Sequence, residues 1–187
     1  MNFSGLFTFR RLMCLLVRQN FSPKCEIAIN KQINMELKAC HEYLAMAYHF
    51  DRSNVALPGV FGFFKKASDE ERTHAEILMQ YMNKRGGQII LEAIPEPKCS
   101  FESTLDAVLK AVEMEKEVNL SLLELHTIAS EERDPNLTSF IESNFLDEQV
   151  EAIKQLCSYA RQIERCNEEL GSYIFDLNID KESLHKN

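Results

Sequence analysis

Apolar residues recur at steps of three and four in four long stretches of the chain. This spacing places them on one face of an α-helix and is typical of amphipathic helices that pack against one another. The five Pro and six Gly residues are few for a chain of 187 residues, and they cluster between these stretches. The pattern therefore predicts an all-α fold with helices over about 22–52, 60–85, 103–132 and 134–166, and a short fifth helix around 173–175.

Capping signals mark where these helices begin and end. Ser22 and Asp134 each precede a proline, which is the usual order of an N-cap and the first helical residue. Ser103 is followed three residues later by Asp106, at the spacing of a capping box. Basic residues and then Gly86 close the second helix, where they face the negative end of the helix dipole and end the helix.

The lengths of the connections predict how the helices are arranged. Short connections follow the first and the third helix, so each of these forms an antiparallel pair with the next helix. The segment from Gln88 to Phe101 contains two prolines and has no helical period. Roughly 15 extended residues reach roughly 50 Å, whereas a helix of roughly 25 residues is about 38 Å long. The middle connection can therefore cross the whole bundle, which predicts a four-helix bundle with one long crossover.

Ionisable and amide side chains interrupt the apolar face of each of the four long predicted helices near its middle. They are, in chain order, Glu36, Glu71, His74, Glu115 and Gln149. A single buried carboxylate without a partner is costly, and several together repel one another. Cations bound between the carboxylates remove this conflict, and oxygen ligands with one imidazole suit iron. The pattern therefore predicts a metal site in the middle of the bundle.

The Glu71-x-x-His74 spacing alone would be weak support for such a site. The same spacing recurs at Glu182 and His185, in a polar tail where we predict no metal site. A single glutamate could also be a partly exposed side chain at the edge of a helix face. The prediction rests instead on five polar residues that lie at matching depth on four helices.

Composition and charge narrow the classes of function. The chain has a net charge of −8, with 45% apolar and 27% charged residues, as expected of a soluble globular protein. An acidic chain is unsuited to nucleic acid and attracts cations. No apolar stretch approaches the roughly 18 residues of a membrane span. The six cysteines include no CxxC pair and no zinc-like spacing, so free thiols are the simpler interpretation.

The first 20 residues differ from the remainder of the chain. They contain Arg10, Arg11 and Arg18 and no acidic residue. This composition resembles a weak mitochondrial targeting segment, and a disordered extension has equal weight. We therefore divide the chain into an extension (1–20), one helical domain (21–182) and a tail (183–187). We expect a cytoplasmic protein, with a mitochondrial location as the alternative.

Several longer motifs indicate one family. The most telling are HFDRSNVAL (49–57), SDEERTHAEILM (68–79), NKRGG (83–87), SLLELH (121–126) and FIESNFLDEQVEAIKQL (140–156). In combination they resemble the heavy-type, ferroxidase-competent ferritins of animals, over roughly residues 18–177. The resemblance implies a ferritin-like four-helix bundle, a fold for which one long crossover is the standard connectivity. It also implies a hollow shell of 24 chains, alone or with other ferritin subunits, that stores iron as hydrated ferric oxide.

The resemblance implies a ferroxidase centre with two irons per chain. Glu36 and His74 would bind one iron. Glu115 would bind the second, and Glu71 would bridge the two. Gln149 would hydrogen-bond near the second iron. The implied reaction is the oxidation of Fe(II) by O2 or peroxide.

Further residues take their expected roles from the same resemblance. Glu70 would assist at the centre and Tyr43 would lie beside it. Glu70 and Glu76 would nucleate the mineral. Glu142 and position 139 would line the channel through which iron enters the shell. This chain has Ser139 where the family has an aspartate, so we expect a weaker field for cations and slower iron uptake.

Two other functions stay open on the sequence. A di-iron oxidase or peroxidase with the same fold usually carries a second Glu-x-x-His on its fourth helix, where this chain has Gln149 and no histidine. A shell subunit that does not oxidise iron would have the same fold, and the presence of the ligand residues does not by itself establish catalytic turnover.

Thr73 stands where the family commonly has an acid, which predicts poorer nucleation of mineral.

Overall fold

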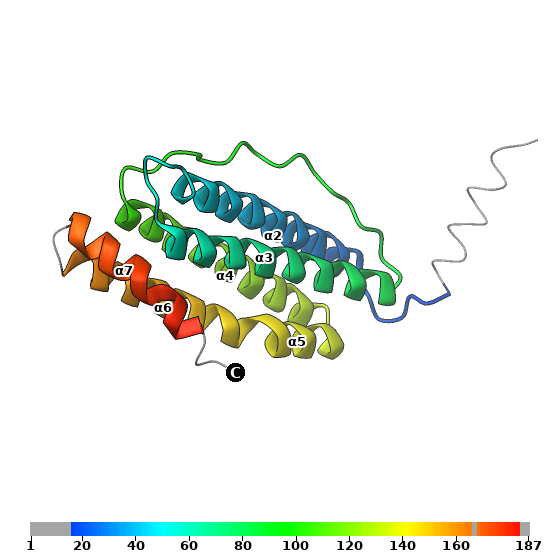
Figure 1. Ribbon diagram of the computed structural model, residues 1–187. Helices are drawn as coiled ribbons and strands as arrows, with labels where there is room; N and C mark the ends of the chain where they lie inside the picture. The colour runs from blue at the N-terminus through cyan, green and yellow to red at the C-terminus, as the bar shows by residue number, and fades with distance from the viewer. Residues whose placement is uncertain (1–15, 166–167, 184–187) are drawn as a thin grey trace, which may run out of the picture.

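The computed structural model describes residues 16–165 and 168–183, which form a bundle of long helices (Figure 1). Its elements are α2 (Pro23–Phe50), α3 (Pro58–Lys84), α4 (Thr104–Glu131), α5 (Pro135–Ile141), the π-helical η1 (Glu142–Leu146), α6 (Asp147–Glu164) and α7 (Glu168–Ser183). Within those two ranges there is no β-strand. The predicted all-α fold, with a long crossover and a C-terminal fifth helix, is confirmed.

The helices begin at the predicted capping residues. Ser22 accepts a hydrogen bond from the backbone N–H of Cys25 at 3.2 Å, and Pro23 is the first helical residue. Ser103 accepts one from the backbone N–H of Asp106 at 3.1 Å. At the fourth helix the Asp134 carboxylate accepts from the third residue beyond it. Each cap satisfies a backbone donor that would otherwise have no partner in the first turn.

Residues 85–103 connect α3 to α4 and run along the length of the bundle (Figure 1). Two asparagines of α2 hold this crossover. Asn30 donates to the carbonyl oxygen of Gln88 at 2.9 Å and accepts from the N–H of Ile90 at 2.8 Å. Asn34 donates to the carbonyl oxygen of Ile90 and accepts from the N–H of Glu92. The crossover therefore pairs with α2 through side-chain amides rather than through a backbone ladder.

The fourth helix contains an irregular turn that the sequence pattern does not indicate. It consists of α5, η1 and α6 without a break, and η1 is a single π-helical segment. A π-segment adds a residue to the turn, so the residues after it are rotated relative to a continuous α-helix. The rotation decides which residues of α6 face α4.

The fifth helix, α7, packs against α3 and α6 near the start of α3 (Figure 1). The Asp176 carboxylate accepts a hydrogen bond from the backbone N–H of Val60 at 3.0 Å. A Cβ atom at Gly59 would lie 2.2 Å from the carbonyl oxygen of Asp176. Only glycine permits so close a contact between the two helices, which fixes the position of α7.

Residues beyond the four-helix core bear on two predictions. Arg18, within the predicted extension, pairs with Glu26 at 2.5 Å, and Asn20 hydrogen-bonds to the carbonyl oxygen of Arg133. The predicted targeting segment falls mainly on residues 1–15, which lie outside the described residues, so the domain limits and the location stay predictions. None of the helices described is both long and apolar enough to span a membrane.

Candidate metal centre

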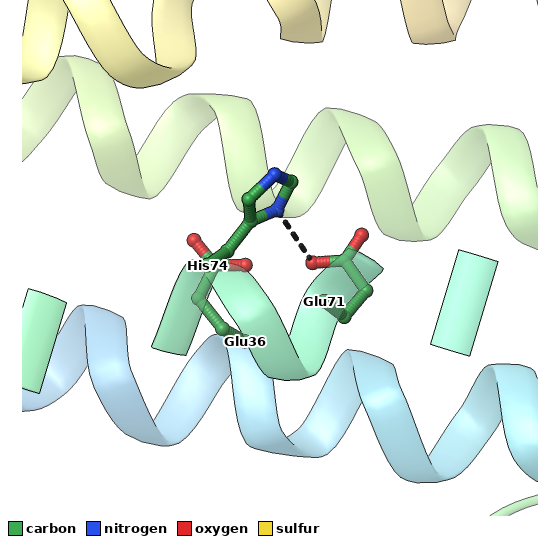
Figure 2. A group of neighbouring side chains, drawn as sticks. All are labelled: Glu36, Glu71 and His74. Carbon is green, nitrogen blue, oxygen red and sulfur yellow. Dashed lines mark hydrogen bonds and ion pairs between the residues drawn. The ribbon is translucent and has the colours of Figure 1, made fainter. Parts of the chain in front are cut away.

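Three helices bring acidic side chains together at the middle of the bundle. Glu36 comes from α2, Glu71 and His74 come from α3, and Glu115 comes from α4. Figure 2 shows the first three of these side chains gathered close together, Glu36 rising from α2 and Glu71 and His74 coming from α3. One ligand atom from each of Glu36, Glu71 and His74 lies within 4.8 Å of the other two. This spacing suits a shared cation.

The helical repeat explains why these residues are buried. Glu71 and His74 are three residues apart and so lie on one face of α3. Each glutamate has an apolar residue three or four positions before and after it in its helix: Ile33 and Ala39 around Glu36, Ala67 and Ala75 around Glu71, and Val112 and Val118 around Glu115. Glu36 is fully buried, and Glu71 and Glu115 are each 4% exposed. The centre therefore holds three acidic residues in surroundings that would ordinarily contain leucine or valine.

Two neighbours hydrogen-bond to the carboxylate of Glu115. The hydroxyl of Tyr43 donates to Oε1. The side-chain amide of Gln149 donates to Oε2 at 3.0 Å and to the backbone carbonyl oxygen of Glu115 at 3.2 Å. Burial and the charge of Glu115 raise the pKa of Tyr43 well above its ordinary value, so the phenol stays a donor. These contacts hold Glu115 in one orientation.

Glu36 and His74 are held by other groups. The amide of Gln32 donates to Glu36 Oε1 at 2.8 Å, and Glu36 Oε2 is buried without a hydrogen-bond partner. The ring of His74 lies between two carboxylates: Nδ1 is 3.4 Å from Glu71 and Nε2 is 3.4 Å from Glu148. Both nitrogens of His74 thus face oxygen atoms.

Burial and mutual repulsion make the metal-free centre hold protons. Burial and the charge of Glu71 raise the pKa of Glu36 well above its usual range. The same two causes raise the pKa of Glu115 to about 7, although hydrogen bonds from its neighbours oppose the shift. Burial alone would lower the pKa of His74, but hydrogen bonds to Glu148 and Glu71 raise it to about 10. A bound cation would displace such protons, because metal ligands must be deprotonated.

A cavity of about 70 Å³ adjoins the centre between α3, α4 and α6. Its polar lining consists of Tyr43, Glu70, Glu71, His74, Glu115, Glu148, Gln149 and Gln155. Glu70 and Glu148 are exposed, whereas Glu71 and Glu115 are buried. Carboxylates therefore lead from the surface to the buried cluster, an arrangement that suits a hard cation with oxygen ligands.

Comparison with known proteins agrees with this arrangement. The sequence profile of the ferritin-like domain matches residues 27–166 of the chain. This chain belongs to the ferritin family. It is 51% identical over 162 residues to a ferritin heavy chain of Echinococcus granulosus, which covers 86% of this chain and 94% of that protein.

Two further relatives have similar coverage. A soma ferritin of Lymnaea stagnalis is 49% identical over 160 residues, which are 85% of this chain and 92% of the relative. A ferritin-2 heavy chain of Schistosoma mansoni is 51% identical over 160 residues, or 85% of this chain and 93% of the relative. The resemblance inferred from the sequence motifs is confirmed at the level of the family.

The ferritin fold brings most of the predicted site residues together. Glu36, Tyr43, Glu70, Glu71, His74, Glu115 and Gln149 all touch the cluster or line its cavity. Glu70 also lies 3.4 Å from Lys66 and reaches the solvent. Glu76 is exposed on α3, and its predicted part in nucleation stays a prediction.

The predicted channel residues lie away from the centre. His126 Nε2 is 2.7 Å from the Glu142 carboxylate. Ser139 lines a separate surface pocket together with Lys84 and Asn136. The roles of Glu142 and Ser139 in a channel between chains stay predictions.

Two residues of the centre were not singled out from the sequence. Gln32 lies on the same face of α2 as Glu36, one turn earlier. This position in the buried face was the feature of the sequence that could have identified it. Glu148 precedes Gln149 and contacts His74. No periodic signal marks Glu148, because it lies at the edge of the buried face of α6.

Proposed function

We propose that this chain is an iron-storage subunit with ferroxidase activity. It oxidises Fe(II) at the buried cluster, with O2 or peroxide as oxidant, and deposits ferric oxide inside a shell of many chains. The observation that carries this proposal is the group formed by Glu36, Glu71 and His74, whose ligand atoms lie within 4.8 Å of one another, with Glu115 hydrogen-bonded nearby. Cations offset the repulsion in such a group.

Iron is the substrate, and each side chain has a separate task in the proposal. Glu36 and His74 bind one Fe(II), Glu115 binds the other, and Glu71 lies between the two positions. Gln149 and Tyr43 hold Glu115 by hydrogen bonds. Glu70 and Glu148, at the exposed side of the cavity, receive Fe(II) from solvent.

In the proposed reaction the chain holds the two Fe(II) ions in place, provides negative charge around them and excludes water. Two Fe(II) ions give up one electron each, and O2 takes up both electrons with two protons to form hydrogen peroxide. Two ions held side by side can deliver this pair of electrons to one oxidant. Water is largely excluded because the surrounding helices bury the cluster.

Storage requires a shell and a surface on which mineral can form. We place nucleation at Glu70 and Glu76, which are exposed about 1.7 turns apart on α3. Glu142 and Ser139 would line the iron-uptake channel between chains. The shell would contain 24 copies of this chain or a mixture with other ferritin subunits.

The alternatives differ in measurable ways. A di-iron oxidase without a storage role would oxidise Fe(II) as a small oligomer and retain no mineral. A shell subunit without activity would form the large particle and leave Fe(II) unoxidised. Fe(II) added aerobically to the purified metal-free protein, with ferric absorbance and particle mass followed together, separates these cases. We expect fast oxidation by soluble particles whose iron content rises while their protein mass stays constant. A monomer that does not oxidise Fe(II) would contradict the proposal.

A further inference from the structure

Gln32 is an amide in the middle of the apolar core. It is fully buried on α2, one helical turn before Glu36, with Ile29 and Ile33 nearby in the same helix. Its Nε2 donates to Glu36 Oε1 at 2.8 Å. Its Oε1 is buried and has no hydrogen-bond partner. The side chain therefore uses only part of its hydrogen-bonding capacity, and it uses that part on Glu36.

A buried acceptor without a partner destabilises a fold, whereas leucine or methionine at this position would pack without that cost. The other buried amides of α2 and α6 have partners on their acceptor or donor sides: Asn30 bonds the crossover and Gln149 bonds Glu115. For Gln32 the structure offers one contact that could justify the cost, and that contact is with Glu36.

The hydrogen bond restricts what the carboxylate of Glu36 can do. A carboxylate on a glutamate side chain can rotate about its last bond and can bind a cation through one oxygen or both. Because Oε1 accepts from Gln32, the plane of the carboxylate is held and one of the two lone pairs of Oε1 is used. Oε2 is buried without a hydrogen-bond partner and remains available for a cation. Hydrogen bonds of this kind orient metal ligands in many proteins.

The opposite side of the centre has a matching arrangement. There the amide of Gln149 donates to Glu115 Oε2 at 3.0 Å, as Gln32 donates to Glu36 at 2.8 Å. Glu36 and Glu115 thus each accept a hydrogen bond from one buried amide, which comes from α2 for Glu36 and from α6 for Glu115. Glu115 also accepts one from the hydroxyl of Tyr43.

We infer that Gln32 is a positioning residue of the centre, which holds Glu36 so that a single oxygen binds the first Fe(II). The inference rests on the proposed function and deepens it. In this account, Gln32 raises the affinity for the metal ion bound by Glu36 and His74. Gln149 in the same way raises the affinity for the metal ion bound by Glu115.

The test replaces the amide by an apolar side chain of similar length, Gln32→Met. Co(II) serves as a visible probe that does not turn over, and it is titrated into the metal-free protein. Loss of such a contact typically weakens metal binding about 10- to 100-fold. We expect a loss of this size at one of the two Co(II) positions, with the other unchanged. In Fe(II) oxidation the half-saturating Fe(II) concentration should rise by a similar factor, with a smaller change in the maximal rate.

Two control variants separate positioning from packing. Gln149→Met should weaken the other Co(II) position and leave the first unchanged. Asn30→Leu removes a buried amide of α2 that contacts the crossover and not the centre, so it should lower stability without changing Co(II) affinity. Equal Co(II) binding by Gln32→Met and wild type would overturn the inference. So would equal weakening of both positions accompanied by a loss of stability like that of Asn30→Leu.

A measurement on the wild-type protein does not depend on any variant folding. In a crystal soaked with Co(II), we expect Gln32 to keep its bond to Glu36 while one oxygen of Glu36 binds the ion. A crystal in which Gln32 has turned away, or both oxygens of Glu36 bind, would overturn the inference. If wild type binds Co(II) in this way yet does not oxidise Fe(II), the proposed function fails and the positioning role stands.

Discussion

Glu36, Glu71 and Glu115 occupy core positions where leucine would make the metal-free protein more stable. Their mutual repulsion and burial are opposed by one imidazole and by hydrogen bonds from Gln32, Tyr43 and Gln149. A residue that destabilises the fold without its ligand is typical of a functional site. The cost of these carboxylates can be measured directly through its dependence on pH.

Replacement of Glu115 by glutamine should stabilise the metal-free protein at high pH. The folded-state pKa of Glu115 is raised to about 7 from 4.5, so between these values the folded chain takes up a proton that the unfolded chain lacks. Stability therefore falls as pH rises through this window. At pH 8 we expect Glu115→Gln to be more stable than wild type by on the order of 3 kcal/mol, from about 1.4 kcal/mol per pKa unit between 4.5 and about 7.

Denaturant unfolding of both proteins at pH 4.5 and pH 8 tests this. At pH 4.5 the carboxyl group is neutral in the folded protein, so the two curves should nearly coincide. Since His74 is present in both proteins, its own titration largely cancels from the difference. A difference that is the same at both pH values would show that Glu115 is not protonated on folding.

Glu71 should matter more to oxidation than any other single carboxylate. It lies beside both proposed iron positions, and its Oε2 is 3.4 Å from His74 Nδ1. In Glu71→Ala the paired geometry is lost, and we expect the initial rate of Fe(II) oxidation to fall by at least about 100-fold, the upper range of the losses seen even for indirect contacts to a metal. Stopped-flow absorbance measures the rate, and Glu76→Ala on the same helix is the control. A rate within threefold of wild type would contradict the assignment.

The sequence identified most of these residues because a polar side chain in an apolar repeat is conspicuous. It did not single out Gln32, since an amide beside a glutamate in a seam can equally lie at its exposed edge. Glu148 has no periodic signal. The contact between His126 and Glu142 joins residues of two helices, so no local pattern could predict it.

The crossover is held to α2 by Asn30 and Asn34 rather than by apolar packing alone. Each amide both donates to and accepts from the crossover backbone. This arrangement keeps a segment without helix or strand in one path along the bundle. It gives stability to the side of α2 that does not face the centre.

Asn34→Ala should therefore loosen the crossover. Each net hydrogen bond contributes about 0.5–1.5 kcal/mol, so we expect a loss of about 1–2 kcal/mol in unfolding free energy. Amide exchange should accelerate at Ile90 and Glu92. Asn178→Ala is the matched control, since that amide donates to the carbonyl oxygen of Ile174 within its own helix. If the two variants exchange alike along the crossover, the asparagines do not hold it.

Helix boundaries were predicted to within a few residues because caps and prolines carry local information. Predicted starts at Ser22-Pro23 and Asp134-Pro135 agree with α2 and α5. The π-segment η1 was not predicted, and a continuous helix was expected instead. A single inserted residue in a turn depends on how α5 and α6 each pack on α4, and no residue between Glu142 and Leu146 is a helix breaker.

The length of the crossover was enough to predict the arrangement of the whole bundle. The crossover length does not predict how chains assemble, because interfaces and channels of an assembly lie between chains. Ser139 lines a surface pocket that also contains Lys84, so the charge near this position is not strongly acidic. The proposed route of iron into the shell is therefore tested best by a change of charge.

Ser139→Asp should speed iron uptake. Each copy would add one negative charge to the proposed channel, and a stronger field raises the local concentration of Fe(II). We expect the initial oxidation rate to increase several-fold at low salt and the gain to shrink at high salt, as screening increases. Ser158→Asp, which makes the same charge change at an exposed position of α6, is the control. No increase for Ser139→Asp, or an equal increase for both, would sink this account of uptake.

The most direct test of the central claim is the stoichiometry of the fast oxidation phase. Metal-free wild type, His74→Ala and His185→Ala are mixed with rising Fe(II) in air-saturated buffer, and ferric absorbance is followed by stopped flow. His185 belongs to the second Glu-x-x-His of the chain, where the sequence predicts no site. We predict a fast phase that saturates at two Fe(II) per chain in wild type and His185→Ala and is lost in His74→Ala. A fast phase in His74→Ala equal to that of wild type, or none in wild type, would contradict the account.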